Sequence, residues 1–167
     1  HDFAILDAMK ADIAEDQCVD AIQVFVTGFS MGGYLSHQTD CMKDDVRSVA
    51  APSDGTHDLS TCTTEHKPII IFHGKSDPVI SDGCDDPNGA TPPGIEPSAL
   101  EWAAKNGCAM TTTSMPVENG ACEYFDGCPA DGQVVLCTFD GMGHCWAGGA
   151  QGAGIFSCPG YESATQL

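Results

Sequence analysis

The sequence predicts an α/β fold, with a mostly parallel sheet flanked by helices and with loops stapled by disulfides. Apolar strand-like segments alternate with helical segments along the 167 residues, the order that builds parallel sheets. One segment, 67–73, holds a continuous apolar run of the kind found in strands buried on both faces. Ten cysteines at scattered spacings, with no Cys-x-x-Cys pair, favour disulfides in an oxidising compartment over zinc ligands.

Each element follows from a local pattern. Residues 2–16 repeat apolar side chains at helical spacing, which predicts an amphipathic helix; these side chains are Phe3, Leu6, Met9 and Ile13. Short apolar runs rich in β-branched residues predict strands at 22–27, 46–51, 67–73 and 133–139. Further helices are expected at 30–43 and at 97–106, the latter with a proline at its start and Gly107 after its end. Residues 81–97 and 141–154 are rich in turn-forming residues and predict loops.

Charge and hydropathy exclude several kinds of partner. The chain has 6 Lys and Arg against 24 Asp and Glu, a net charge of −18. Nucleic acids and anionic membrane surfaces are poor partners for such a chain, because phosphate groups are bound by clustered cations. No apolar run is long enough to cross a bilayer. We therefore expect a single globular domain over 1–167 with no nucleic-acid or membrane partner.

The segment Thr27-Gly28-Phe29-Ser30-Met31-Gly32-Gly33 carries the clearest chemical motif. A Gly-x-Ser-x-Gly sequence between a predicted strand and a predicted helix indicates the nucleophile elbow of an α/β-hydrolase. That turn lifts the Ser30 hydroxyl clear of the sheet, at a helix N-terminus. Gly28 and Gly32 are expected because side chains there would crowd the turn. The alternative interpretation is a Gly/Ser turn that only joins two elements.

A serine hydroxyl is a weak nucleophile, so it needs a base, and the base needs an orienting acid. In α/β-hydrolases these residues follow one another as serine, acid and histidine. Asp77 lies in the loop after strand 67–73, and His144 lies in the loop after strand 133–139. Open parallel sheets place their sites at this carboxyl edge. The sequence therefore predicts Ser30, Asp77 and His144 as the catalytic residues.

Other histidines and acids are less well placed for these roles. His73 ends a strand and is expected to pack beside the site, and His37 lies on a predicted helix. His57 and His66 lie in a polar loop that follows no predicted strand end. The alternatives for the acid are Asp54, Asp82 and Asp140.

Two further residues are expected to serve the site. The backbone N–H of Met31 follows the nucleophile at the helix start and is the expected oxyanion-hole donor. Trp146 lies two residues after His144. Its ring either lines a substrate pocket or serves only in packing against the rest of the protein. Residues 82–89 concentrate oxygen ligands, but their spacing does not match an EF-hand, so no metal site is expected.

Four blocks spread over nearly the whole chain carry a family resemblance: 19–33, 71–79, 101–108 and 141–149. The elbow block is common to α/β-hydrolases. The Trp-Ala-Ala-Lys-Asn-Gly-Cys run at 102–108 and the Gly-His-Cys-Trp run at 143–146 are more particular. Together they resemble secreted esterases of the polyhydroxybutyrate depolymerase and feruloyl or acetylxylan esterase type, related to carbohydrate esterase family 1.

The resemblance implies a serine carboxylic-ester hydrolase that is extracellular or periplasmic. It implies a Ser30–Asp77–His144 triad, an acyl-enzyme intermediate and no cofactor. The expected substrates are feruloyl or acetyl esters of plant polysaccharides, and the alternative is a polyester depolymerase. An alternative of another class is a non-catalytic binding domain on a hydrolase scaffold. Because family members begin with further strands, residues 1–167 resemble a single catalytic domain truncated at both ends.

Overall fold

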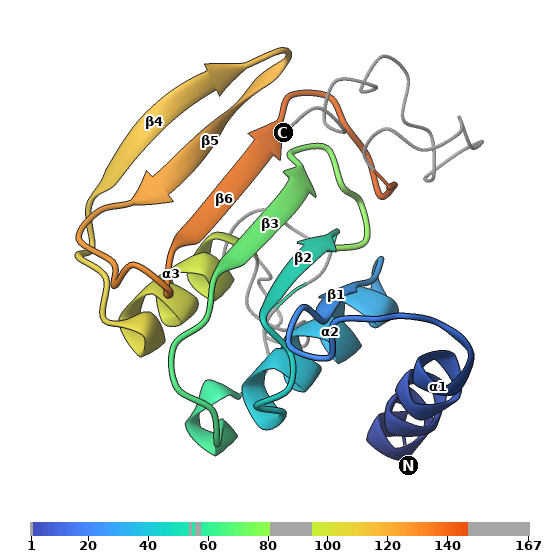
Figure 1. Cartoon of the computed structure of the whole chain (residues 1–167). Helices are drawn as coiled ribbons and strands as arrows, with labels where there is room; N and C mark the ends of the chain where they lie inside the picture. The colour runs from blue at the N-terminus through green and yellow to red at the C-terminus, as the bar shows by residue number, and fades with distance from the viewer. Residues whose placement is uncertain (1, 54, 56–57, 81–94, 147–167) are drawn as a thin grey trace.

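The computed structural model describes residues 2–53, 55, 58–80 and 95–146. Helices and strands alternate over most of this part of the chain, as Figure 1 shows. The helices are α1 (Asp2–Asp16), α2 (Met31–Met42) and α3 (Ile95–Asn106), with a short 3-10 helix at Leu59–Thr61. The strands are β1 (Phe25–Thr27), β2 (Ser48–Pro52), β3 (Ile69–Gly74), β4 (Thr112–Val117), β5 (Gly120–Phe125) and β6 (Val134–Phe139).

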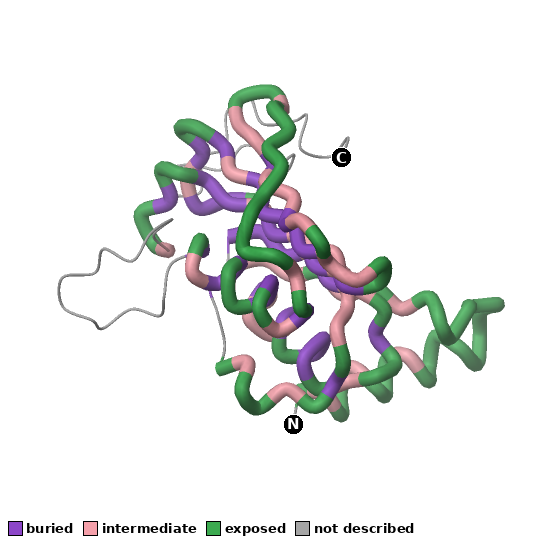
Figure 2. The backbone as a smooth tube through the Cα atoms, turned by 90° about the vertical axis from the view of Figure 1, so that its left-hand side faces the viewer, coloured by how far each residue is buried: buried purple, intermediate pink, exposed green. Residues whose placement is uncertain are grey.

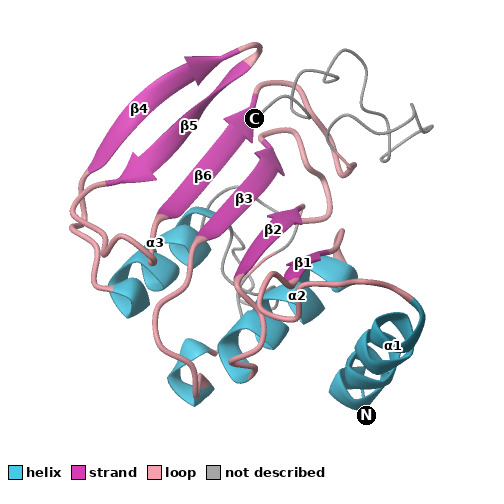
Figure 3. Ribbon diagram, in the orientation of Figure 1, coloured by secondary structure: helices cyan, strands magenta, loops and turns pink. Residues whose placement is uncertain are grey.

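Within the described residues the strands form one six-stranded sheet in the order β1-β2-β3-β6-β5-β4. The pairings β1–β2, β2–β3 and β3–β6 are parallel, whereas β5 pairs antiparallel with both β6 and β4. Helices α2 and α3 lie behind this sheet in Figure 3. The predicted α/β class, with a mostly parallel sheet and flanking helices, is confirmed.

The longest parallel pairing, between β3 and β6, forms the centre of the sheet. Its register runs from Ile69 opposite Val134 to Gly74 opposite Phe139. Both strands are mostly apolar, with His73 and Thr138 as their polar side chains, and both are largely buried on the two faces, as the apolar runs predict. Consequently the loops that leave β3 and β6 emerge side by side at one edge of the sheet.

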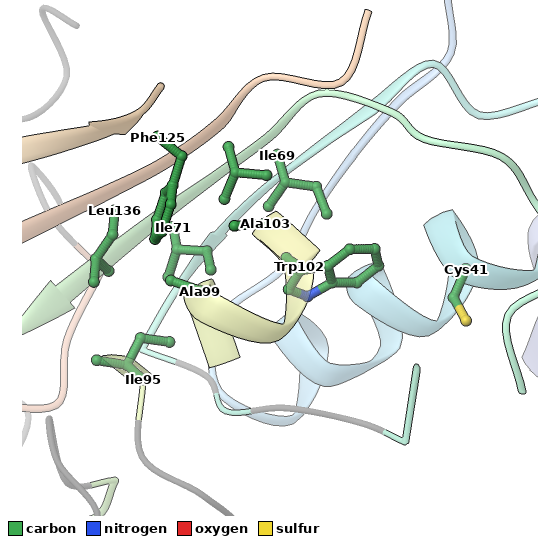
Figure 4. Close-up of a cluster of buried hydrophobic side chains, with 10 residues drawn as sticks. Cys41, Ile69, Ile71, Ile95, Ala99, Trp102, Ala103, Phe125 and Leu136 are labelled. Atoms are coloured by element: carbon green, nitrogen blue, oxygen red, sulfur yellow. The ribbon is translucent and has the colours of Figure 1, made fainter. Parts of the chain in front are cut away.

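Side chains alternate along β6 and supply a core on each face of the sheet. Val134 and Leu136 face α3, where they join Ile69, Ile71 and the buried Trp102 in one cluster (Figure 4). The opposite face holds a second cluster that includes four residues of β5, β6 and the loop after β6, namely Cys122, Cys137, Phe139 and Met142. Burying a large apolar side chain stabilises the fold by about 1.5–3 kcal/mol, so these clusters hold the sheet rigid beneath the loops.

Helix α1 differs from the prediction in its packing. The helix spans the predicted residues, but none of them is buried, and Met9 and Ile13 are 56% and 49% exposed. Ion pairs join it instead to the end of α2, from Lys10 to Asp45 and from Lys43 to Asp7. The predicted helix is therefore present, but its apolar side chains form no buried face against the part of the chain that the structure describes.

The β4–β5 hairpin is the one element pair that the sequence analysis did not predict. β4 lies at the edge of the described sheet and has five exposed residues, and Figure 2 looks onto this edge. A strand with so little burial lacks the apolar alternation on which strand prediction depends. Two residues, Glu118 and Asn119, connect the paired Val117 and Gly120, and Asn119 has a positive φ of 59°.

The predicted disulfides are confirmed. Three bridges join described residues: Cys41–Cys62, Cys108–Cys128 and Cys122–Cys137. Cys145 is disulfide-bonded as well, whereas the exposed Cys18 is a free thiol. Two of the bridges fall in the second half of the chain, where Cys122–Cys137 joins the paired strands β5 and β6. By closing covalent loops they restrict the conformations of the unfolded chain. Over the same described ranges, no helix has the length and apolar character needed to cross a membrane.

One buried carboxylate lies in the core between α2 and α3. Asp40 is fully buried, and neither of its carboxylate oxygens has a hydrogen-bond partner among the described residues. Burial raises the pKa of this carboxyl from 3.8 to about 6, although the charges of Lys67, His37 and Lys105 oppose the shift. The folded state therefore holds this proton more tightly than the unfolded state.

We expect Asp40→Asn to stabilise the protein at neutral pH but not in acid. A raised folded-state pKa means that stability falls as pH rises from about 4 to about 6, and the full penalty persists above that range. The variant removes this penalty, so its advantage should grow from near zero at about pH 4 to about 2–3 kcal/mol at about pH 7.5. Urea unfolding at both pH values measures it, with the exposed Asp44→Asn as control. An advantage that does not change with pH would contradict this account.

Candidate active site

The Gly-x-Ser-x-Gly segment forms a sharp turn between the end of β1 and the start of α2, the strand-turn-helix arrangement that the motif predicts. Ser30 immediately precedes α2 and has φ 55° and ψ −118°, a strained conformation for a residue with a side chain. Two backbone hydrogen bonds hold the turn, from Ser30 N–H to Pro52 O at 3.3 Å and from Tyr34 N–H to Ser30 O at 3.1 Å. The turn is thus anchored to both β2 and α2.

The two glycines of the motif have different roles. A Cβ atom on Gly28 would stand 2.1 Å from the carbonyl oxygen of Gly32, so no side chain fits there. A Cβ on Gly32 would meet no described atom within 4 Å. The expectation that both glycines are required by crowding is therefore wrong for Gly32, because its Cα–Hα points into open space.

Gly28→Ala and Gly32→Ala form a matched pair that tests this difference. We expect Gly28→Ala to prevent formation of the elbow, since the clashing atom belongs to the backbone and cannot move aside. Gly32→Ala should fold normally and raise helix stability by up to about 1 kcal/mol, because alanine is the better helix former. Thermal unfolding of both variants provides the measurement. Equal melting temperatures for the two would contradict the elbow geometry.

The loop after β3 carries Asp77 and folds around its carboxylate. Asp77 is buried, and its Oδ1 accepts hydrogen bonds from the N–H groups of Val79 at 2.8 Å and Ile80 at 2.9 Å. Its own N–H donates to Gly74 O at 3.0 Å. The other carboxylate oxygen, Oδ2, is thereby directed towards the neighbouring loop.

The loop after β6 carries His144, and it packs directly on the Asp77 loop. Ser76 N–H donates to Met142 O at 3.0 Å, and a Cβ on Gly74 would stand 2.1 Å from that same oxygen. Glycine at 74 therefore lets the two loops approach closely. The close approach follows from the parallel pairing of β3 with β6, which brings both loops to one edge.

Ser30, His144 and Asp77 are joined by two hydrogen bonds. His144 Nδ1 lies 2.8 Å from Asp77 Oδ2, and His144 Nε2 lies 2.9 Å from Ser30 Oγ. The carboxylate can only accept, so Nδ1 carries the hydrogen and Nε2 is left to accept from the serine hydroxyl. The His144 and Asp77 side chains are 3% and 0% exposed. This geometry allows a serine hydroxyl to pass its proton to an imidazole whose tautomer is held by a carboxylate.

The other two predicted site residues lie beside this group. Met31 begins α2, where backbone N–H groups have no acceptor within the helix. Its side chain is 84% exposed. Trp146 is 43% exposed, two residues after His144, and Val79 is 47% exposed, two residues after Asp77. Apolar side chains thus adjoin each of the three hydrogen-bonded residues along the chain.

The competing candidates lie elsewhere or outside the described residues. His37 is buried against Trp102 between the helices, and His66 pairs with Asp131. Asp140 is exposed and pairs with Lys75. His57, Asp54, Asp82 and the oxygen-rich loop 82–89 fall outside the described residues.

Ser53 is a residue that the sequence analysis missed. It follows β2, is fully buried and has a positive φ of 52°. Its Oγ donates to Cys145 O at 3.2 Å, and its N–H donates to Phe72 O at 2.9 Å. Ser53 therefore ties the His144 loop to the sheet. Its only signal in the sequence is its place at the carboxyl end of a parallel strand.

Comparison of the sequence with known proteins identifies relatives of this chain. No family model matches the chain. It is 32% identical to feruloyl esterase B of Piromyces equi, over 84% of this chain and 28% of that protein. It is 36% identical to "Probable feruloyl esterase C" of Aspergillus oryzae, over 69% of this chain and 39% of that protein. It is 32% identical to feruloyl esterase C of Emericella nidulans, over 86% of this chain and 50% of that protein.

The chain therefore spans half or less of the length of these curated relatives. The matched region nevertheless covers most of the chain in each comparison, at identities of 32% to 36%. The resemblance to feruloyl esterases that the sequence blocks indicate is confirmed. Over most of its length, this chain is a homologue of the fungal feruloyl esterases.

Proposed function

We propose that this chain is the catalytic part of a serine carboxylic-ester hydrolase of the feruloyl esterase type. The observation that carries the proposal is the hydrogen-bonded series Ser30 Oγ, His144 Nε2 and Nδ1, Asp77 Oδ2 at the carboxyl edge of the sheet. Homology to feruloyl esterases supports the choice of ester bonds as the reacting group. The proposed mechanism needs no cofactor, because the three side chains supply nucleophile, base and orienting acid.

In the proposed reaction, Ser30 Oγ attacks the ester carbonyl carbon while its proton passes to His144 Nε2. Asp77 stabilises the imidazolium, and the Met31 N–H donates to the negative oxygen of the tetrahedral intermediate. The intermediate collapses to an acyl-enzyme on Ser30, and the alcohol leaves with the proton from His144. Water then attacks the acyl carbon, giving its proton to His144, and the acid departs as Ser30 recovers its hydrogen.

The exposed apolar side chains near the three residues favour an apolar acyl group. Met31, Val79 and Trp146 are each at least 43% exposed, and each adjoins one of the reacting residues along the chain. An aromatic feruloyl group fits such surroundings, since aromatic rings and apolar side chains associate in water. The same feature favours a second candidate, a polyester depolymerase acting on an apolar polymer surface.

The proposed setting is outside the cell. Disulfides persist in oxidising compartments, and the described residues hold three of them besides a bonded Cys145. A net charge of −18 makes nucleic acid an unsuitable partner. The partner that we propose is therefore the ester substrate itself, linked to a polysaccharide or contained in a polyester.

A panel of esters tests the proposal: methyl ferulate, p-nitrophenyl acetate, p-nitrophenyl butyrate and a hydroxybutyrate oligomer. We expect hydrolysis, with the highest kcat/KM for methyl ferulate. A preference for the hydroxybutyrate oligomer would favour the polyester depolymerase. A chain that unfolds cooperatively on heating but hydrolyses none of the four would contradict catalysis by this chain and favour a binding domain.

A further inference from the structure

The loop that carries Asp77 is closed at both ends by hydrogen bonds. At its start, Asp77 N–H donates to Gly74 O at 3.0 Å. At its end, Ile80 N–H donates to Asp77 Oδ1 at 2.9 Å. The position of the carboxylate therefore depends on where the Ile80 backbone is held, because Ile80 supplies one of the two donors to Oδ1.

His73 holds the Ile80 backbone from the other side. It is fully buried near the end of β3, directly before Gly74, and its Nε2 lies 3.0 Å from Ile80 O. A carbonyl oxygen can only accept, so His73 Nε2 carries the hydrogen. Both backbone groups of Ile80 are thus engaged, the N–H by Asp77 and the C=O by His73.

His73 itself has a fixed place in the sheet. It lies opposite Thr138 in the β3–β6 pairing, near the end of a strand that contributes side chains to the cores on both faces of the sheet. The hydrogen bond from the His73 ring therefore fixes the Ile80 end of the Asp77 loop relative to strand β3. The bond from His73 Nε2 ends on the Ile80 carbonyl and not on a reacting atom of the proposed mechanism, so the effect of this bond on catalysis passes through Ile80 and Asp77.

We propose that His73 is a positioning residue for Asp77. Its Nε2–H donates to the Ile80 carbonyl and so acts as a clamp on the loop, which keeps the Asp77 carboxylate hydrogen-bonded to His144 Nδ1. This inference deepens the proposed esterase function and depends on it for its kinetic consequence. Without the donor, the Ile80 carbonyl lacks its partner and the loop relaxes. A displacement of about 1 Å in a catalytic group can lower the rate by about 10²-fold.

Three variants and a matched control test the clamp. His73→Phe removes the donor at similar volume. His73→Gln places an amide N–H at the level of Nε2, whereas His73→Asn places it one bond nearer the backbone, short of Ile80 O. The control is His37→Phe, the same exchange at another fully buried histidine, which packs against Trp102 away from the loop.

Kinetics on the ester that the panel selects give the first result. We expect His73→Phe and His73→Asn to lower kcat about 10- to 10²-fold with little change in KM. His73→Gln should recover most of kcat, and His37→Phe should leave it unchanged. If His73→Phe fails to fold, the comparison of Gln with Asn decides. Equal kcat values for Gln and Asn, or an equal loss in His37→Phe, would overturn the proposal.

Proton NMR gives a second result that needs no substrate. The hydrogen between His144 Nδ1 and Asp77 Oδ2 should give a strongly deshielded resonance, assigned by its loss in Asp77→Asn. We expect it to broaden or vanish in His73→Phe and to persist in His73→Gln and His37→Phe. This pattern in a chain that hydrolyses no ester would contradict the esterase proposal but support the clamp. An unchanged resonance in His73→Phe would overturn the clamp.

Discussion

Ser30→Ala is expected to lower kcat for ester hydrolysis by about 10⁴- to 10⁶-fold. The variant removes the hydroxyl oxygen that lies 2.9 Å from His144 Nε2 and that attacks the carbonyl carbon in the proposed reaction. His144 and Asp77 would remain hydrogen-bonded, but they would have no nucleophile to activate. The measurement is the initial rate with methyl ferulate, at enzyme concentrations high enough to detect the residual activity of the variant.

The stability of Ser30→Ala should stay close to that of the wild-type chain, because the serine side chain makes no capping hydrogen bond to helix α2. Ser114→Ala is the matched control, since Ser114 lies on the exposed edge strand β4 and far from Ser30 in the sheet order. Its kcat should equal the wild-type value. An activity in Ser30→Ala within about tenfold of wild type would exclude Ser30 as the nucleophile.

Asp77→Asn is expected to lower kcat by about 10³- to 10⁴-fold with little change in KM. The Asn oxygen can replace Oδ1 as acceptor for Val79 and Ile80, which leaves the amide NH₂ facing His144 Nδ1. An amide N–H there donates to Nδ1 and moves the imidazole hydrogen to Nε2. In that tautomer Nε2 cannot accept the proton of Ser30.

Asp140→Asn is the control for this variant, because Asp140 is the rival acid in a neighbouring loop and is bound to Lys75 on the surface. An exposed ion pair contributes less than about 1 kcal/mol, so kcat should change by less than about threefold. Steady-state kinetics of the two variants distinguish the two acids. A larger loss in Asp140→Asn than in Asp77→Asn would reverse the assignment.

The parallel core was predictable from sequence because its strands are buried on both faces. The apolar run 67–73 and the run 133–139 correspond to β3 and β6, within one or two residues at each end. β1 begins three residues later than predicted, at Phe25. The preceding residues form a turn in which Ile22 N–H binds Asp20 Oδ1 and Gln23 N–H binds Asp20 O. Such side-chain capture of the backbone competes with strand pairing.

The hairpin was missed although one signal for it was present. Asn119-Gly120 is the kind of dipeptide that marks tight hairpin turns, because asparagine tolerates a positive φ. The polar run of β4 and Pro116 within it hid the flanking strand. The three disulfide pairings join cysteines 15 to 21 positions apart, and no local pattern encodes which cysteines pair.

The three residues of the candidate site were predictable because each one follows a recognisable strand. The elbow motif marks Ser30, and parallel strand ends mark Asp77 and His144. The supporting contacts of Ser53 and His73 were not, since these side chains reach the loops through hydrogen bonds to the backbone carbonyls of Cys145 and Ile80. Their roles depend on distances between loops, and these distances exist only in the folded chain.

Covalent trapping tests the central claim most directly. The wild-type chain and Ser30→Ala are incubated with a fluorophosphonate, which reacts with activated serines, and are then analysed by intact mass and peptide mapping. The account predicts one adduct per chain, located on Ser30, slowed strongly in Asp77→Asn and absent in Ser30→Ala. An adduct on another residue, or full loss of ester hydrolysis in a wild-type chain whose Ser30 remains unmodified, would contradict it.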